Sequence, residues 1–190
     1  MDQTLTPLTG RVLIAMPGMS DPRFHHAVVL VCAHGDDGAM GLVLNRPVQE
    51  IRFSRLLDQL GIETEGQPRD VPVHYGGPVE TARGFVLHRR TTDEMPEGQM
   101  PIGDGLAMTS TRDILEDFAR GKGPEQAVLS LGYAGWGPGQ LESEMLDNGW
   151  LTADASDTLL FGTDNDAKWQ QALKSIGIDP LMLSATAGHA

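Results

Sequence analysis

Short runs of apolar residues, rich in β-branched side chains, recur along the chain and predict the strands of a sheet. Glycine, proline, asparagine and aspartate separate these runs, as is typical of turns between strands. The runs cover residues 12–14, 28–31, 42–44, 71–75, 85–87, 127–131 and 159–161. The GDDG sequence at 35–38, between the second and third runs, suits a tight hairpin turn. We therefore expect the second and third strands to pair antiparallel.

Apolar residues at helical spacing mark three helices and a weaker fourth. Residues 110–121 combine a capping serine, an apolar stripe and a terminal glycine. Residues 164–176 place apolar side chains three and four positions apart, and a glycine follows them. A third helix is expected from about Pro138, and the weaker one over 53–60.

These strands and helices alternate without a regular β-α-β rhythm, and the early hairpin argues against a purely parallel sheet. The 190 residues, 40% of them hydrophobic, are enough for one ordinary core without disulfides or a structural metal. The sequence therefore predicts one α+β domain with a mixed sheet over residues 1–190. The segment 91–105 holds two prolines, three glycines and four acidic residues, so we expect a flexible loop there.

The charge balance is strongly acidic, with 14 Lys and Arg residues against 26 Asp and Glu residues and a net charge of −12. Only three residues are lysines, and Arg89–Arg90 is the longest basic run, so direct binding of nucleic acid is not expected. Asp2 stands where a signal peptide needs positive charge, and the longest apolar run, 27–33, is too short to span a membrane. The single cysteine, Cys32, suits a reducing compartment. We expect a cytoplasmic protein.

Residues with catalytic or metal-binding chemistry show no recognisable arrangement. Cys32 and His34 would share one face of a strand, but a cysteine that ends a hydrophobic strand is more typical of a packed thiol. The histidine pair at 25–26 and the acidic turn at 36–37 lack the spacing of a metal site, so no metal or cofactor is expected. Phosphate-loop and G-x-S-x-G motifs are absent. These observations favour a protein that is not an enzyme.

Three predicted strand exits carry residues suited to binding, because loops on a rigid sheet are where binding groups usually lie. The first offers an arginine able to bind a carboxylate or phosphate, and the second has two glycines that leave room for a ligand. The third is a glycine-rich turn with a tryptophan that enters a helix. The resulting candidate site consists of Asn45, Arg46, Gly76, Gly77, Trp136 and Gln140.

Each of these features also has a purely structural interpretation. Arg46 would then form an ordinary surface salt bridge, and Trp136 would be a buried plug in a structural turn. Glu142 and Glu144, on different faces of the helix that follows, are expected to be solvated rather than catalytic.

Several motifs with characteristic spacing occur in order along the chain. They are LIAMPGMSDPRF (13–24), GAMGLVLNRP (38–47), GGPV (76–79), GFVLH (84–88), LGYAGWGPGQLESE (131–144) and GHA (188–190). On these motifs the chain resembles the YqgE/AlgH family of bacterial proteins, which is largely uncharacterised and offers no catalytic residues to carry over. The resemblance implies one α+β domain whose mixed, split sheet curls toward a pseudo-barrel with helices packed outside. Some members carry the label of transcriptional regulator.

The expected function is that of a non-enzymatic binding or regulatory module in the cytosol. Its partner would be a small anionic ligand or another protein, because a net charge of −12 disfavours contacts with phosphate backbones. Two alternatives stay open at this point. One is a transcriptional regulator that acts on DNA, and the other is an enzyme with a small anionic or nucleotide-like substrate.

Overall fold

The structure is a computed structural model that describes residues 7–183. The GHA motif at 188–190 and Asp2, both used in the sequence analysis, lie outside the described residues. The chain forms two compact units. Unit 1 consists of Met1–Asn45 and Ala134–Ala190, and unit 2 consists of Arg46–Tyr133.

Unit 1 contains an antiparallel sheet in which two of the three inner strands are buried on both faces over most of their length. Its strands are β1 (Arg11–Ala15), β2 (Val28–Gly35), β3 (Gly38–Val43), the end of β8 (Ala127–Trp136) and β9 (Trp150–Asp154). They pair in the order β8-β3-β2-β1-β9. The predicted β2–β3 hairpin is confirmed, with Gly35 opposite Gly38. The residues from Val12 to Ala15 are fully buried, which explains why these strands read as continuous apolar runs.

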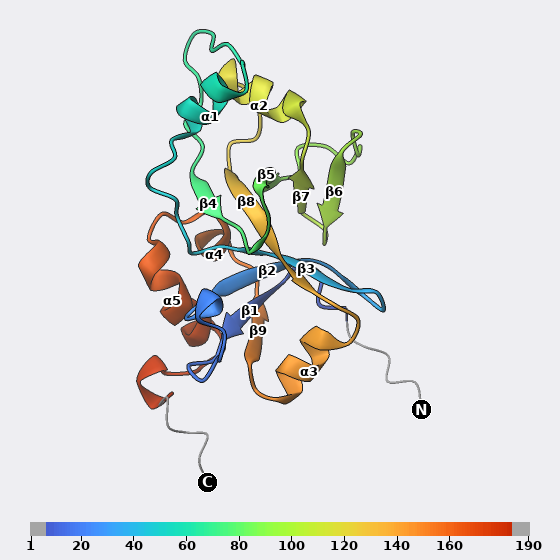
Figure 1. Cartoon of the computed structure of the whole chain (residues 1–190), viewed down its shortest axis with the longest axis vertical. Coiled ribbons are helices and arrows are strands. Elements are labelled where there is room, and N and C mark those ends of the chain that lie inside the picture. Colours follow the sequence, from blue (N-terminus) through green and yellow to red (C-terminus); the bar gives the residue numbers. More distant parts are fainter. Residues whose placement is uncertain (1–6, 184–190) are drawn as a thin grey trace. The chain divides into compact units, whose positions relative to one another are not determined.

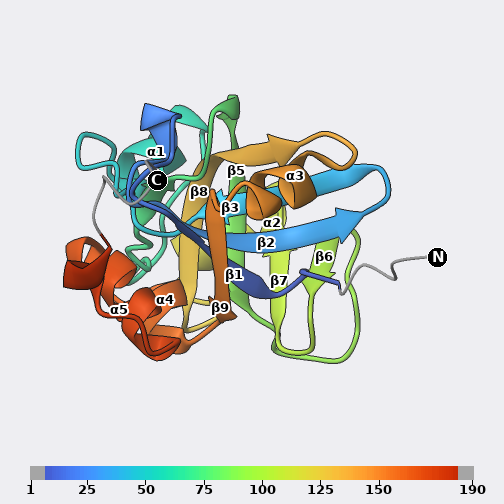
Figure 2. The ribbon, with the colours of Figure 1, turned by 90° about the horizontal axis from the view of Figure 1, so that it is seen from below.

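Helices cover this sheet from two sides. They are α3 (Gln140–Leu146), α4 (Asp157–Phe161) and α5 (Lys168–Ser175), accompanied by three short 3-10 turns, Pro22–Phe24, Asn165–Ala167 and Pro180–Met182. Figures 1 and 2 show α4 and α5 on one side of β1, β2 and β9, and α3 on the other. Trp169 of α5 donates its indole N–H to the carbonyl oxygen of Ala15 at 2.8 Å. Leu141 of α3 packs in the core with Leu13 and Val29. The helix predicted from about Pro138 and the helix predicted over residues 164–176 are both confirmed.

The strand predicted over residues 159–161 is wrong, because these residues end helix α4. Ser156 caps that helix and accepts a hydrogen bond from the backbone N–H of Leu159 at 3.3 Å. Leu159 and Leu160 are both buried although they are adjacent, which a strand buried on one face would not allow.

Unit 2 contains a mixed sheet, as the sequence predicted. Its strands are β4 (Val73–Tyr75), β5 (Val79–Arg89), β6 (Gln99–Ile102), β7 (Leu106–Thr109) and the first part of β8. They pair in the order β6-β7-β5-β8-β4, and only β4, among the strands of this unit, runs parallel to its neighbour. The prediction of a flexible loop over residues 91–105 is wrong at Gln99–Ile102, which form strand β6. Its backbone pairs with β7, and Ile102 is buried despite the polar composition around it.

Two helices, α1 (Phe53–Gln59) and α2 (Arg112–Ala119), pack on the sheet of unit 2 and lie next to each other in Figure 1. The rings of Phe53 and Phe118 meet edge to face at 5.9 Å. Both rings belong to a core that includes Val86 of β5 and Leu129 of β8. Both helices were predicted, but α2 begins one residue later than expected, with Thr111 and not Ser110 at the N-cap.

Candidate functional site

The side chain of Asn45, a residue of the predicted site, forms hydrogen bonds with two backbone groups of unit 1. This side chain is buried, and its amide oxygen accepts a hydrogen bond from the N–H of Val28 at 3.0 Å. Its amide nitrogen donates to the carbonyl oxygen of His26 at 2.9 Å. The side chain therefore ties the chain after β3 to the start of β2, which is the role of a structural brace.

Arg46, Gly76 and Gly77 lie in unit 2, at the end of β4. The carbonyl oxygen of Arg46 accepts a hydrogen bond from the N–H of Tyr75 at 2.8 Å, and partial burial lowers the pKa of the Arg46 guanidinium. A Cβ atom at Gly76 would lie 2.3 Å from the carbonyl oxygen of Gly132. A Cβ at Gly132 would in turn lie 2.5 Å from the carbonyl oxygen of Gly77. These glycines permit two backbones to approach each other.

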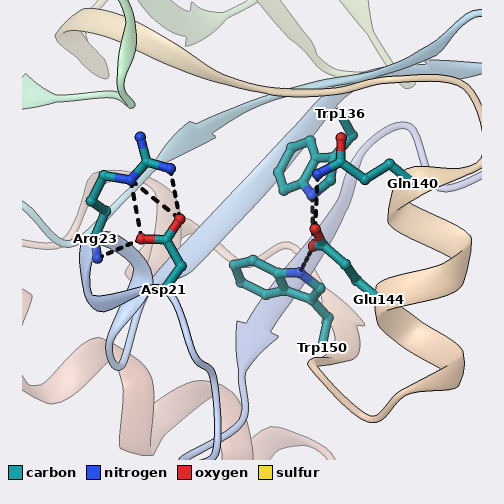
Figure 3. Close-up of polar contacts among 6 residues, drawn as sticks. All are labelled: Asp21, Arg23, Trp136, Gln140, Glu144 and Trp150. Carbon is teal, nitrogen blue, oxygen red and sulfur yellow. Dashed lines mark hydrogen bonds and ion pairs between the residues drawn. The ribbon is translucent and has the colours of Figure 1, made fainter.

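Trp136 and Gln140 lie together in unit 1 around one carboxylate (Figure 3). The indole N–H groups of Trp136 and Trp150 both donate to Oε2 of Glu144, at 3.0 and 2.8 Å. Gln140 donates to Oε1 of the same carboxylate at 2.9 Å. Trp136 is buried, as its interpretation as a structural plug requires. The expectation that Glu144 is solvated is wrong, because its partly exposed carboxylate accepts hydrogen bonds from both indoles and from Gln140.

Glu142 is also not simply solvated. Its Oε1 lies 2.6 Å from Nε2 of His34, whose side chain is only 3% exposed. The N–H of Leu8 points at Nδ1 of the same ring at 3.2 Å, so Nδ1 accepts and Nε2 carries the proton that is donated to Glu142. The pKa of Glu142 lies below its ordinary value, because its own backbone N–H and then the His34 ring donate to the carboxylate.

The two tryptophans pack against Phe24, which follows an exposed ion pair. The Phe24 ring meets the Trp150 ring edge to face at 5.7 Å. Just before it, Arg23 donates to both carboxylate oxygens of Asp21 (Figure 3), and this hydrogen bonding lowers the pKa of Asp21. The family-like motifs around Asp21 and Trp136 thus build one aromatic and polar cluster inside unit 1.

The remaining reactive residues of unit 1 have structural partners. Cys32 is 1% exposed, and burial raises the pKa of its thiol to about 12, which confirms the packed thiol. His25 stacks on His26 at 4.1 Å, and His26 stacks on Trp169 at 3.9 Å. Within residues 7–183, no three His, Cys, Asp or Glu side chains gather into a set that could hold a metal ion.

The six predicted residues are divided between the two units. Asn45, Trp136 and Gln140 belong to unit 1, whereas Arg46 and the glycine pair belong to unit 2. Their assembly into one site therefore stays a prediction.

Unit 2 holds a cavity of about 450 Å³ that the sequence analysis did not find. This volume is within the range of small-molecule sites. Helix α1, strands β5 and β8, and the connection from β7 into α2 surround it. Its apolar lining consists of Phe53, Leu56, Leu57, Leu60, Ala82, Val86, Leu115, Leu129 and Leu131. Gln59, Ser110, Thr111, Arg83 and Arg112 supply polar groups.

The charged residues that line this cavity are both arginines, in a chain with a large excess of acid. Both side chains are about half exposed, 54% for Arg83 and 53% for Arg112. Arg112 is held firmly, since it donates to Glu116 and to the carbonyl oxygen of Leu60, both at 2.8 Å. Arg83 lies over the Phe85 ring at 5.0 Å, and its ion pair with Glu80 is long, at 3.8 Å.

A buried polar group adjoins the same cavity. Thr109, which lines it, has its Oγ1 2.8 Å from Nε2 of His88, and Gln99 lies 3.2 Å from the same nitrogen. Burial lowers the pKa of His88, and its Nδ1 lies 2.8 Å from the carbonyl oxygen of Arg89, so Nδ1 carries the proton. The Thr109 hydroxyl therefore donates to Nε2. His88 is only 2% exposed, which favours a structural role for this group.

Sequence reasoning missed this cavity because its lining looks like ordinary core. The lining residues come from four segments between positions 53 and 131, and each segment shows only the apolar periodicity of a helix or strand. One signal was available. On β5, the side chains at 82, 84 and 86 share a face, and two of the three are Ala or Gly, which leaves space on that face.

The fold and these features define an α+β protein with a ligand-sized cavity in one unit. The sequence model of the AlgH-like family matches residues 12–181. A UPF0301 protein of Paracoccus denitrificans is 63% identical over 191 residues and covers 100% of both chains. A UPF0301 protein of Ruegeria pomeroyi is 56% identical, over 96% of this chain and 99% of its own. The chain belongs to the AlgH-like family.

Solved structures show the same fold. The solution structure of the AlgH protein from Pseudomonas aeruginosa matches with a TM-score of 0.77 and 40% identity, over 100% of both chains. The crystal structure of protein DIP2367 from Corynebacterium diphtheriae matches with a TM-score of 0.69 over 89% of this chain and 87% of its own. At 19% identity, the second match concerns the fold alone. The predicted α+β class and the family resemblance are confirmed.

Proposed function

We propose that this protein is a cytosolic, non-enzymatic regulatory module that binds a small anionic ligand in the cavity of unit 2. The observation that carries the proposal is the cavity of about 450 Å³ whose charged lining residues are Arg83 and Arg112. A concave, mostly apolar site with a few convergent polar groups is the usual form of a small-molecule site. The excess of acid elsewhere makes the two arginines among the lining residues a local feature that favours an anion.

A second candidate function is an enzyme that acts on a small anionic substrate. The Thr109 hydroxyl, hydrogen-bonded to Nε2 of His88 beside the cavity, is the observation that favours it. A hydroxyl beside a basic imidazole nitrogen is the arrangement of an activated nucleophile. The burial of His88 counts against this role, because a general base must exchange its proton with substrate and solvent.

The test is a screen of small carboxylates, phosphates and nucleotides by thermal shift, followed by amide chemical-shift mapping of the hits. A bound ligand raises the melting temperature by mass action. We expect hits among anionic compounds, with shifted amide signals at Gly84, Thr109 and Arg112. Hits that map only to residues of unit 1, or a screen with no hits at all, would contradict the proposal. Turnover of any hit that Thr109→Val abolishes would favour the enzyme instead.

A further inference from the structure

The backbone N–H of Leu8 and the carboxylate of Glu142 meet the two nitrogens of one buried imidazole. Leu8 donates to Nδ1 of His34 at 3.2 Å, and Nε2 of the same ring lies 2.6 Å from Oε1 of Glu142. We propose that His34 is a pH-sensitive latch, which in its neutral form holds the N-terminal segment of residues 7–9 on unit 1 and in its protonated form releases it. This latch lies in unit 1 and does not involve the cavity of unit 2, so it stands apart from the proposed function.

The protonation state of the ring decides whether it can hold Leu8. A neutral imidazole carries one N–H group and one lone pair, whereas an imidazolium carries N–H groups on both nitrogens. Because the carboxylate of Glu142 needs a donor, Nε2 holds the proton of the neutral ring and Nδ1 accepts from Leu8. When a proton from solvent binds Nδ1, no orientation of the ring offers an acceptor, and the N–H of Leu8 faces a second N–H.

Burial prevents water from replacing the lost acceptor. The side chain of His34 is only 3% exposed. Its partner across the hairpin, on β3, is Ala39, whose side chain has no hydrogen-bonding group. Because buried polar groups without partners are costly, the protonated ring and the Leu8 N–H must separate so that both find new partners.

The N-terminal segment is the part that can move. The carbonyl oxygen of Leu8 accepts from the N–H of Arg11 at 2.9 Å, which closes a local turn and does not tie the segment to the sheet. The tie to the sheet comes later in the chain, where the N–H of Gly10 donates to the carbonyl oxygen of Val31 at 2.8 Å. Leu8 is partly buried against the core that contains Leu13 and Val31. Release of residues 7–9 therefore leaves β1 and β2 paired and exposes apolar surface of that core.

The charged groups around the latch leave His34 as the group that titrates. The elements packed around the ring carry the charged residues Glu142 and Glu144 of α3, Arg11 of β1, and Asp36 and Asp37 of the hairpin turn. Arg11 is paired with Asp154, and Glu144 accepts from two indole N–H groups. The pKa of Glu142 lies below its ordinary value, so its carboxylate stays ionised over the range in which histidines titrate. That carboxylate favours the protonated form of His34, which offsets part of the cost of releasing Leu8.

The experiment is an NMR titration of the full chain from about pH 8 to about pH 5. The ring protons of His34 report its protonation, and hydrogen exchange of the Leu8 amide, corrected for the intrinsic pH dependence of exchange, reports its hydrogen bond. We expect the protection of Leu8 to fall by about tenfold, as for the loss of one hydrogen bond, with the same midpoint as the His34 ring signals. The Gly10 amide, bonded to Val31, should keep its protection.

Two variants and one control assign the effect to the ring. His34→Gln takes up no proton in this range, so the protection of Leu8 should be the same at both ends of the titration. Glu142→Gln removes the charge that favours the imidazolium and should move both midpoints together to lower pH. His25→Gln, at an exposed position of the same unit, should leave the titration of Leu8 unchanged.

Protonation of His34 with the Leu8 amide still protected would overturn the latch. A His34 ring that stays neutral down to about pH 5 would do the same, as would a loss of Leu8 protection that persists in His34→Gln. A parallel loss of protection at Gly10 and throughout unit 1 would show acid unfolding of the unit instead, and would also overturn the inference.

Discussion

Lys168 is completely buried in unit 1, where its ammonium group donates to the carbonyl oxygen of Leu44 at 2.9 Å. Burial removes water from the charged form and lowers the pKa of this lysine to about 8. In the unfolded chain the pKa of a lysine is about 10.4. Between these values the unfolded chain holds a proton that the folded chain has released, so the free energy of unfolding rises with pH through this window.

We therefore predict that Lys168→Met loses stability relative to the wild type as the pH rises from 7.5 to 9.5. The wild type gains on the order of 1–2 kcal/mol from Lys168 over this interval, and the methionine has no such dependence. Urea unfolding at both pH values measures the difference. Lys174→Met, at an exposed position of the same helix, should follow the wild type. Identical pH profiles for Lys168→Met and the wild type would show that the lysine keeps an ordinary pKa when folded.

Single residues of the predicted site illustrate where sequence reasoning ends. The sequence indicates that Trp136 lies in an unusual turn, and the structure shows that its side chain is buried. The expectation that Glu144 is solvated fails because its carboxylate accepts a hydrogen bond from Trp136 and another from Trp150, which lies in a different element. The same expectation fails for Glu142, because its hydrogen-bond partner His34 is 108 positions away in the sequence. Spacing within one segment predicts neighbours along that segment, whereas these partly exposed carboxylates bind side chains of other elements.

At the scale of elements, strand β4 depends on a close approach between two backbones. The N–H of Gly76, directly after β4, donates to the carbonyl oxygen of Leu131 in β8 at 2.8 Å. A Cβ at Gly76 would lie 2.3 Å from the carbonyl oxygen of Gly132 and 2.9 Å from the Cβ of Ser130. These atoms belong to β8, which is paired with β5 on one side and β4 on the other, and they have little freedom to move.

Gly76→Ala is therefore expected to lower the free energy of unfolding by about 2–3 kcal/mol, because overpacking forces the strands apart. Gly18→Ala is the matched control, since nothing lies within 4 Å of the added methyl group there. That substitution should change stability by less than about 0.5 kcal/mol. Denaturant unfolding of both variants makes the comparison. Equal stability of the two variants would contradict the close packing of β4 against β8.

The sequence predicted those elements whose apolar pattern is strong on its own. Strands β1 to β5 and β8, and helices α1, α2, α3 and α5, coincide with predicted segments. The sequence analysis does not predict β6, β7 and β9, which are short and owe their extended form to pairing, β6 and β7 with each other and β9 with β1. The sequence pattern predicts a strand where helix α4 lies, because three apolar residues in a row carry no helical period, and the signal for the helix is the cap at Ser156.

At the scale of the whole chain, charge is distributed unevenly between the units. Ten of the 14 Lys and Arg residues lie in unit 2, together with 14 of the 26 acidic residues. Several of these arginines form hydrogen bonds that stabilise the fold of unit 2. Arg69 donates to the carbonyl oxygens of Gly123, Pro124 and Glu125, and Arg112 to Glu116. Among the described helices, none is both long and apolar enough to cross a bilayer.

This distribution yields the last prediction, which concerns DNA. Proteins that hold a duplex neutralise several phosphates with Lys and Arg, and their affinity falls steeply as salt rises. Here the arginines of unit 2 are outnumbered by carboxylates, and unit 1 carries twelve acidic residues against four basic ones. We expect no binding of a labelled duplex at about 0.15 M salt, measured by fluorescence anisotropy, and at most weak binding at about 0.02 M salt. Micromolar or tighter binding at the higher concentration, with a steep dependence on salt, would require a cationic surface and would favour a regulator that acts directly on DNA.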